Sequence, residues 1–394
     1  MAGREPRGAR RAVAALRSAA AAALVGLAAA CGTAVSTAGA VSTAGAVSTA
    51  GAGRSVAAVT AFQESSGVTI TETGSTLLYP LAGTWAKAYH QQYPGVTVTT
   101  AATGSGTGIN DASDGSADIG ASDAYLSSGD LVTNSHLLNI PLAVSAQTVI
   151  YNLPELPAGS HVQLDGTVLA EIYQGTVTRW NDPAIEALNK TLPLPALKIV
   201  PIRRSDSSGD TFLFTSYLST QDPAWNASIG YGTTADWPTP AGELAKKGSK
   251  AILQSCRSTP GCVAYNGISY LAQAQAAGLG EAALENSAGA FKLPTATTIT
   301  DSVDSFVSLT PPNETISMID GPSVDGQGYP IINYEYAIVS AQQPDAVMAR
   351  AIKAFLSWVI TTGNDTSYLD TVGFQPLSGT VKQLGETQIA QIGW

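Results

Sequence analysis

The chain has 394 residues, a hydrophobic content of 44% and a formal net charge of −10. This length can bury a full core and favours two domains over one. The first 31 residues contain five arginines and one glutamate, so the net charge of the remaining residues is more negative than that of the whole chain. An acidic body lacks the basic face that neutralises nucleic-acid phosphates, and we expect no nucleic-acid partner. A small anion can still bind in a local pocket of directed hydrogen-bond donors.

The N-terminal segment has the order of an export signal. Arginines within residues 4–17 precede a small-residue apolar run over 18–30, which is too short to span a membrane as a helix. Ala28-Ala29-Ala30-Cys31 is similar to a bacterial lipoprotein cleavage box, although the usual leucine is displaced to Leu27. We therefore expect residues 1–31 to be a signal peptide in which Cys31 becomes the lipid-modified first residue. An ordinary signal peptide with an incidental cysteine is the alternative.

The segment after Cys31 is built from small residues. The sequence Ala-Val-Ser-Thr-Ala-Gly runs three times between Ala34 and Gly51. Such a segment buries too little apolar surface to offset the entropy lost on ordering, so residues 32–67 are predicted to be a flexible tether. The globular body is expected to start near Val68. The protein is therefore predicted to be exported and lipid-anchored to the outer face of the cytoplasmic membrane.

The two remaining cysteines agree with export. Cys256 and Cys262 flank a Pro-Gly turn that lets the chain double back, and we expect them to form a disulfide. This bond would stabilise the fold only a little, because a short loop has little closure entropy to remove. A metal site is the alternative, but the histidines, His90, His136 and His161, are scattered singly. We expect no metal and no cofactor, and we interpret the histidines as structural or surface residues.

The body alternates between strand and helix patterns. Strands are predicted over 68–71, 96–99, 119–121, 142–151 and 331–339, and helical patterns over 80–93, 212–218 and 345–359. This rhythm predicts α/β layers around largely parallel sheets. Ligands of such sheets bind beyond the carboxyl ends of the strands, where the Gly/Ser/Thr turns of this chain fall.

Three of these turns are suited to an anion. The stretch Arg203-Arg204-Ser205-Asp206-Ser207-Ser208-Gly209-Asp210-Thr211 places a guanidinium fork ahead of a small-residue turn that opens a helix. Arginine matches oxyanion geometry, and the first backbone N–H groups of a helix have no partner within the helix. Similar turns lie at Thr73–Thr76 and Thr103–Gly108. Together they predict one shared anionic ligand, although each turn alone is commonly just a helix cap.

These motifs, in order, resemble those of the phosphate-binding protein of the high-affinity phosphate ABC importer, the PstS family, and in particular its actinobacterial lipoprotein branch. The matching segments are Thr71–Pro80, Gly104–Gly108, Ile119–Ala124, Arg203–Asp210 and Tyr329–Ala337. The resemblance runs from about Val68 to the C-terminus.

The family's fold implies an α/β, two-lobe periplasmic-binding-protein-like architecture of type II with a ligand cleft between the lobes. The two strands that cross between the lobes are placed near 142–151 and 329–339. Lobe I would then comprise residues 68–143 plus 335–394, and lobe II residues 144–334.

The resemblance also implies the ligand contacts. It places phosphate contacts at Ser75, Thr76, Leu77, Ser105, Asp123, Arg204, Ser208, Gly209 and Asp210, with Asp206 holding the arginine in place. Leu77 stands where many relatives have Phe, which should be harmless because the contact is a backbone N–H. Asp123 is the expected acceptor carboxylate, which attracts a ligand bearing P–OH and repels sulfate, which bears no proton. Asp210 replaces the Thr of enterobacterial relatives, and beside the ligand it would favour the more protonated phosphate ion.

The expected function is capture of inorganic phosphate and its delivery to the permease and ATPase subunits of an ABC importer, without enzymatic activity. The alternatives are a phosphate-ester hydrolase and a surface-exposed adhesin or signalling module on the same fold. A hydrolase is disfavoured because the sequence has no Gly-x-Ser-x-Gly elbow and no clustered histidines. Asp123 and Asp210 could form an acid/base pair, but Ser105 and Ser208 have no candidate base beside them.

Overall fold

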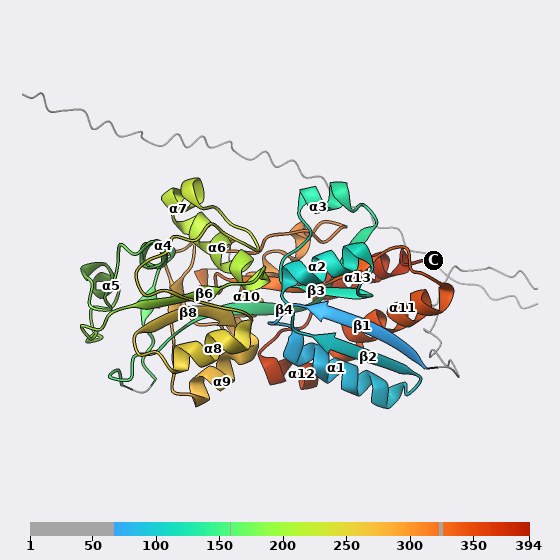
Figure 1. Ribbon diagram of the computed structural model, residues 1–394, viewed down its shortest axis with the longest axis horizontal. Helices are drawn as coiled ribbons and strands as arrows, with labels where there is room; N and C mark the ends of the chain where they lie inside the picture. Colours follow the sequence, from blue (N-terminus) through green and yellow to red (C-terminus); the bar gives the residue numbers. More distant parts are fainter. Residues whose placement is uncertain (1–66, 158, 323–325) are drawn as a thin grey trace, which may run out of the picture. The chain divides into compact units, whose positions relative to one another are not determined.

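The computed structural model describes residues 67–157, 159–322 and 326–394 (Figure 1). The predicted signal peptide, the predicted lipidation site Cys31 and the predicted tether lie outside these residues, apart from Gly67. Within the described ranges, no helix combines the length and the apolar character needed to cross a bilayer.

Most strands belong to one mixed sheet with the order β2-β1-β3-β12-β4-β8-β6-β7, and β9 pairs with β4 beside this path. Its strands are β1 (Val68–Gly74), β2 (Val96–Ala101), β3 (Ile119–Ser122), β4 (Leu137–Tyr151), β6 (Val200–Arg204), β7 (Leu244–Lys246), β8 (Cys262–Gly267), β9 (Gly280–Glu281) and β12 (Ile332–Ser340). A small sheet joins β11 (Phe291–Lys292), β10 (Ala283–Glu285) and β5 (Gln163–Leu164).

Helices cover both faces of the sheet. They are α1 (Tyr79–Gln92), α2 (Ser105–Asp114), α3 (Ser128–Thr133), α4 (Gly166–Gln174), α5 (Pro183–Leu188), α6 (Gly209–Gln221), α7 (Pro223–Ser228), α8 (Ser249–Arg257), α9 (Leu271–Ala276), α10 (Ala296–Asp304), α11 (Ala346–Ile360), α12 (Thr366–Leu369) and α13 (Gly379–Ala390). In Figure 1, α1 and α2 lie on opposite sides of β1, and α6 and α8 on opposite sides of β6. We call the part around β1, β2 and β3 the β1 half and the part around β6, β7 and β8 the β6 half.

The local patterns explain these elements. In α1, Leu81, Trp85 and Tyr89 are four residues apart and therefore share one face, which is buried, while Pro80 occupies the first turn. In β2, Val96 and Val98 are buried between exposed threonines, as expected for a strand with one covered face. The predicted strands and helices are confirmed, with boundaries that shift by up to five residues.

The centre of the sheet differs from the expected parallel arrangement. The pairs β1-β2, β1-β3, β6-β7 and β6-β8 are parallel. In contrast, β4 and β12 pair antiparallel with each other, and β4 also pairs antiparallel with β8. The physical reason is that β4 carries the chain out of the β1 half and β12 returns it, so these two buried strands must run in opposite directions. The prediction of largely parallel sheets therefore holds only within each half.

A disulfide joins the end of α8 to the start of β8 in the β6 half. Cys256 and Cys262 are bonded, with their Cα atoms 5.4 Å apart. Both side chains are fully buried, so the bond holds α8 against the sheet within the core.

Candidate functional site

The turns after β1, β2, β3 and β6 bring the predicted site residues together where the two halves meet. The N–H of Gly106 donates to the carbonyl of Ser207 across this junction at 3.2 Å. The hydroxyl oxygens of Thr76 and Ser249 lie 2.6 Å apart. These contacts place the carboxyl ends of strands from both halves around one buried position, as the α/β pattern predicts.

The first turn depends on a glycine at the end of β1. Gly74 has a φ of 141°, and a Cβ there would lie 2.0 Å from the carbonyl oxygen of Ala121. Glycine alone tolerates this close approach, which turns the chain towards α1. The hydroxyl of Ser75 accepts a bond from the N–H of Leu78 at 2.9 Å and donates to the carboxylate of Asp123. The N–H groups of Thr76 and Leu77 donate to no residue in the described ranges.

The other two predicted turns open α2 and α6. Ser105 is the first residue of α2, and its hydroxyl accepts a bond from the N–H of Asp123 at 3.2 Å. Ser208 is the N-cap of α6, and its fully buried hydroxyl has no partner among the described residues. The N–H groups of Gly209 and Asp210 also lack a partner within this part of the chain. Donors of this kind at converging helix starts form a site for an anion.

Arg204, the last residue of β6, is held by two carboxylates. Its Nε and Nη2 donate to Asp206 at 2.8 and 2.5 Å, and its Nη1 donates to Asp210 at 2.6 Å. Burial opposes the charge of the guanidinium, but the bonds with Asp206 and the charge of Asp210 outweigh it and raise the pKa of Arg204. Arg203 points away from the site and pairs with Glu243 at 3.0 Å.

Asp210 has a crowded carboxylate. One oxygen accepts bonds from Arg204 and from the hydroxyl of Ser249 at 2.9 Å, and the other accepts from Gln147 at 3.2 Å. The side chain is fully buried. Its direct contact with a ligand remains a prediction, whereas its role in fixing the guanidinium follows from these bonds.

Asp123 lies at the end of β3 and is 2% exposed. Burial and the charge of Asp210 raise the pKa of its carboxyl to about 7, while bonds with Ser75 and Glu335 and the charge of Arg204 oppose the increase. A Cβ on Gly209 would lie 2.4 Å from Asp123 Oδ2, so α6 can begin beside this carboxylate only with glycine at that position. The Asp123 carboxylate therefore lies next to the unpaired N–H groups at the start of α6.

Several residues of the site were not expected from the sequence. Ser249 begins α8, so a fourth helix start reaches the site, and the Gly248-Ser249 pair ahead of an amphipathic helix was the available signal. The others lie on the two central strands, where polar residues interrupt apolar runs: Ser145, Gln147, Asn333 and Glu335.

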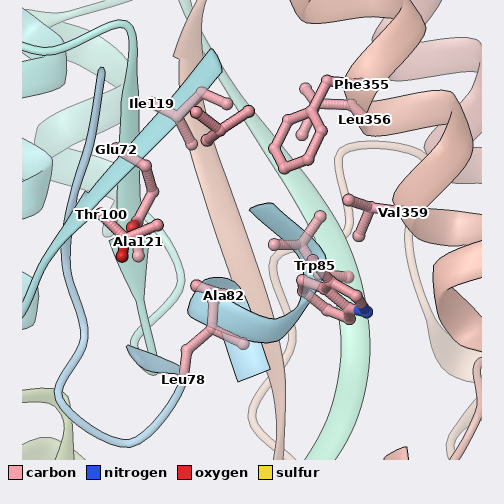
Figure 2. A pocket seen from close by; sticks show the side chains of 12 residues that line it. Glu72, Leu78, Ala82, Trp85, Thr100, Ile119, Ala121, Phe355, Leu356 and Val359 are labelled. Carbon is pink, nitrogen blue, oxygen red and sulfur yellow. The ribbon is translucent and has the colours of Figure 1, made fainter. Parts of the chain in front are cut away.

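A small cavity of about 20 Å³ lies in the β1 half, lined by residues other than those predicted to bind the ligand (Figure 2). Its walls are mainly apolar side chains of α1, α11 and the neighbouring strands, including Trp85, Phe355 and Val359. Glu72 of β1 points into it, and burial raises the pKa of that carboxyl to about 8. A cavity of this size holds at most a water molecule. Across the described ranges, no three side chains group in a way that could hold a metal ion.

Comparisons with known proteins identify the family. Residues 29–362 match the family model of the PBP superfamily domain. The phosphate-binding protein PstS of Methanocaldococcus jannaschii is 32% identical over 84% of this chain and 88% of its own length. The phosphate-binding protein PstS 3 of Mycobacterium tuberculosis is 33% identical over 82% of this chain and 86% of its own.

Solved structures agree on the fold. The phosphate-binding protein from Stenotrophomonas maltophilia superposes with a TM-score of 0.63 at 20% identity, covering 81% of this chain and 93% of that one. The expected two-lobe fold is thereby confirmed. The matched length and the level of identity to the PstS proteins together mean that this chain belongs to the PBP superfamily and, within it, to the PstS family of phosphate-binding proteins.

Proposed function

We propose that this protein binds inorganic phosphate in the site between its two halves and delivers it to the permease and ATPase subunits of an ABC importer. The observation that carries the proposal is the convergence of unpaired helix-start N–H groups, the buried hydroxyl of Ser208 and the fixed guanidinium of Arg204 on one position. Family membership supports the transport role, because the relatives are named as phosphate-binding proteins.

The ligand contacts implied by the family resemblance support selective binding of phosphate over sulfate. Asp123 is buried beside the start of α6, where it can accept a hydrogen bond from a ligand P–OH. Sulfate has no proton at neutral pH and would leave this acceptor facing another negative oxygen. Sites that leave a buried polar group unpaired reject the wrong ligand by factors on the order of 10⁴ to 10⁵.

The proposed transport function has two further parts, closure of the lobes and attachment to the membrane. The lobes, residues 68–143 plus 335–394 and residues 144–334, would close on phosphate and shift the population towards a form that docks on the permease. Export through the signal peptide and lipid attachment at Cys31 would keep the protein at the outer face of the cytoplasmic membrane.

Calorimetry tests the binding function. Phosphate is expected to bind with 1:1 stoichiometry at pH 7, arsenate to compete with it, and sulfate to give no measurable heat. Asp123→Asn and Arg204→Ala should each weaken phosphate binding, and sulfate binding as tightly as phosphate would refute the model.

A steady-state phosphatase assay on the same protein tests the hydrolase alternative. No turnover is expected, because the hydroxyl of Ser105 accepts a backbone bond and that of Ser208 has no basic partner in the described part of the chain. Absence of stoichiometric phosphate uptake in equilibrium dialysis would instead favour an adhesin or signalling module.

A further inference from the structure

Glu335 is a fully buried acidic residue that reaches the site from the central strand β12. Its Oε1 accepts bonds from the hydroxyl of Ser145 at 2.6 Å and from the amide of Asn333 at 3.0 Å. Its Oε2 lies 3.4 Å from the hydroxyl of Ser75, which itself donates to Asp123. The two carboxyl groups thus meet around one serine hydroxyl.

The backbone of β12 directs this side chain into the site. The pairing of β12 with β4 changes register between Glu335 and Tyr336. Such irregularities re-aim side chains and are common beside functional sites. Asn333, two residues earlier on the same face of the strand, also donates to the carbonyl of Asp123 at 3.3 Å. The strand therefore presents two polar side chains to one aspartate.

The charges around this pair do not balance if every acid is ionised. The groups that face it from the neighbouring elements are Asp123 after β3, Arg204 of β6, Asp206 and Asp210. One guanidinium, already bound to Asp206 and Asp210, would have to compensate four carboxylates including Glu335. A site with that excess of negative charge would repel an incoming anion.

The remaining ionisable neighbours supply no positive charge. Tyr265 contacts the β6 side of the cluster and Tyr336 follows Glu335, and burial raises the pKa of both phenols, so they stay neutral. A proton on one of the two carboxyls that share the Ser75 hydroxyl is therefore the simplest way to reduce the negative charge.

Of the two carboxyls, Glu335 is the better holder of that proton. Burial and the charge of Asp123 raise the pKa of Glu335 well above its usual value, against bonds from Ser145 and Asn333. Burial and the charge of Asp210 raise the pKa of Asp123 to about 7, against bonds with Ser75 and Glu335 and the charge of Arg204. The amide of Asn333 donates to Oε1, and the hydroxyl of Ser145, which also reaches Asn333 Oδ1, lies against the same oxygen of Glu335. Oε2 is therefore the oxygen that carries the proton.

We propose that Glu335 stays protonated in the binding site and donates its O–H to Asp123, which makes it a positioning residue for the carboxylate that accepts the ligand proton. This inference rests on the proposed phosphate-binding function. The donated bond orients Asp123 and compensates part of its charge, so that its free lone pairs face the ligand. Loss of this proton at alkaline pH would place two repelling carboxylates beside the phosphate and weaken its binding.

The test is calorimetric titration of the full chain with inorganic phosphate from pH 6 to pH 9.5, comparing wild type with Glu335→Gln and Glu335→Leu. A glutamine amide keeps an N–H donor towards Asp123 at every pH. We expect Glu335→Gln to bind phosphate at pH 7 within roughly threefold of wild type, and to lose less affinity than wild type towards pH 9.5. Glu335→Leu removes the donor and should weaken binding roughly tenfold or more at all pH values.

Glu314→Gln is the matched control, because Glu314 is equally buried but lies outside the site. It should leave phosphate affinity and its pH profile unchanged. Infrared spectra at pH 8 add an independent readout: the C=O band of a protonated carboxyl should lose intensity in Glu335→Gln relative to wild type.

The outcomes separate the two proposals. Failure of wild type to bind phosphate at pH 7 would refute the proposed function itself. If wild type binds phosphate normally, two results would overturn the proposed role of Glu335 and leave the phosphate-binding function standing. One is a severe loss of affinity in Glu335→Gln at pH 7, and the other is a pH profile of that variant equal to that of wild type. If Glu335→Leu does not fold, the pair of wild type and Glu335→Gln still decides the question.

Discussion

The cavity around Glu72 makes the stability of this fold depend on pH in a way that can be measured. Its side chain is 7% exposed, and neither carboxylate oxygen has good hydrogen-bond geometry to a described residue. Burial raises the pKa from 4.5 to about 8, and the backbone of Ala101 opposes this only partly. The pKa of Glu72 is higher in the folded protein than in the unfolded chain. The contribution of its neutral carboxyl to the free energy of unfolding is therefore complete below pH 4.5 and is lost as the pH rises through 8. The total loss is on the order of 5 kcal/mol.

Glu72→Gln removes this titration while keeping the shape of the side chain. We expect the free energy of unfolding of the variant, relative to wild type, to increase by about 4 kcal/mol between pH 5 and pH 9. The assay is urea unfolding at several pH values without phosphate, because a bound ligand would add its own stabilisation. Glu386→Gln on the exposed face of α13 is the matched control, since it removes the same formal charge from the surface. If both variants show the same dependence on pH, the Glu72 carboxyl is not held neutral by its cavity and the reasoning fails.

Two further variants probe the phosphate site by calorimetry. Arg204→Lys cannot reproduce the paired bonds to Asp206 and should weaken phosphate binding roughly tenfold or more. Arg203→Lys is its control, because Arg203 pairs with Glu243 away from the site, and this variant should bind phosphate as wild type does. Equal losses in both variants would contradict the assignment of Arg204. Gly209→Ala introduces a Cβ 2.4 Å from the acceptor carboxylate and should lower affinity by a similar factor, with a small change in melting temperature. Gly83→Ala is its control, because a Cβ on Gly83 would have no atom within 4 Å. If both variants bind phosphate with wild-type affinity, the start of α6 is not tightly packed against Asp123.

The sequence predicted the parts of the site that local chemistry determines. Turns of Gly, Ser and Thr before apolar helix patterns can be recognised without knowledge of the fold, and the structure brings Ser75, Ser105 and Ser208 together as the family resemblance implies. The pairing of Arg204 with Asp206 is also local, because the two residues are separated by one position.

The missed residues depend on contacts between distant parts of the chain. Ser145 and Asn333 are 188 positions apart, and the bond between them at 2.7 Å exists only because β4 and β12 pair in one register. A polar residue in an apolar strand pattern gives no indication of its partner. The antiparallel centre of the sheet escaped prediction for the same reason, since strand direction follows from how the chain passes between the halves.

The central strands β4 and β12 do more than join the two halves, because side chains of β4 bind residues on both sides of the site. On β4, Ser145 binds Glu335 while Gln147, two residues later, donates to the carbonyl and carboxylate of Asp210. Asp123 on one side of the site and Arg204 on the other are thus both connected to the same short, fully buried part of β4. A change in the β4–β12 register would move Asp123 and Arg204 relative to each other even if every turn kept its shape. The ligand geometry is therefore determined by the same strand pairing that joins the two halves, and binding must be sensitive to substitutions at Ser145 and Gln147.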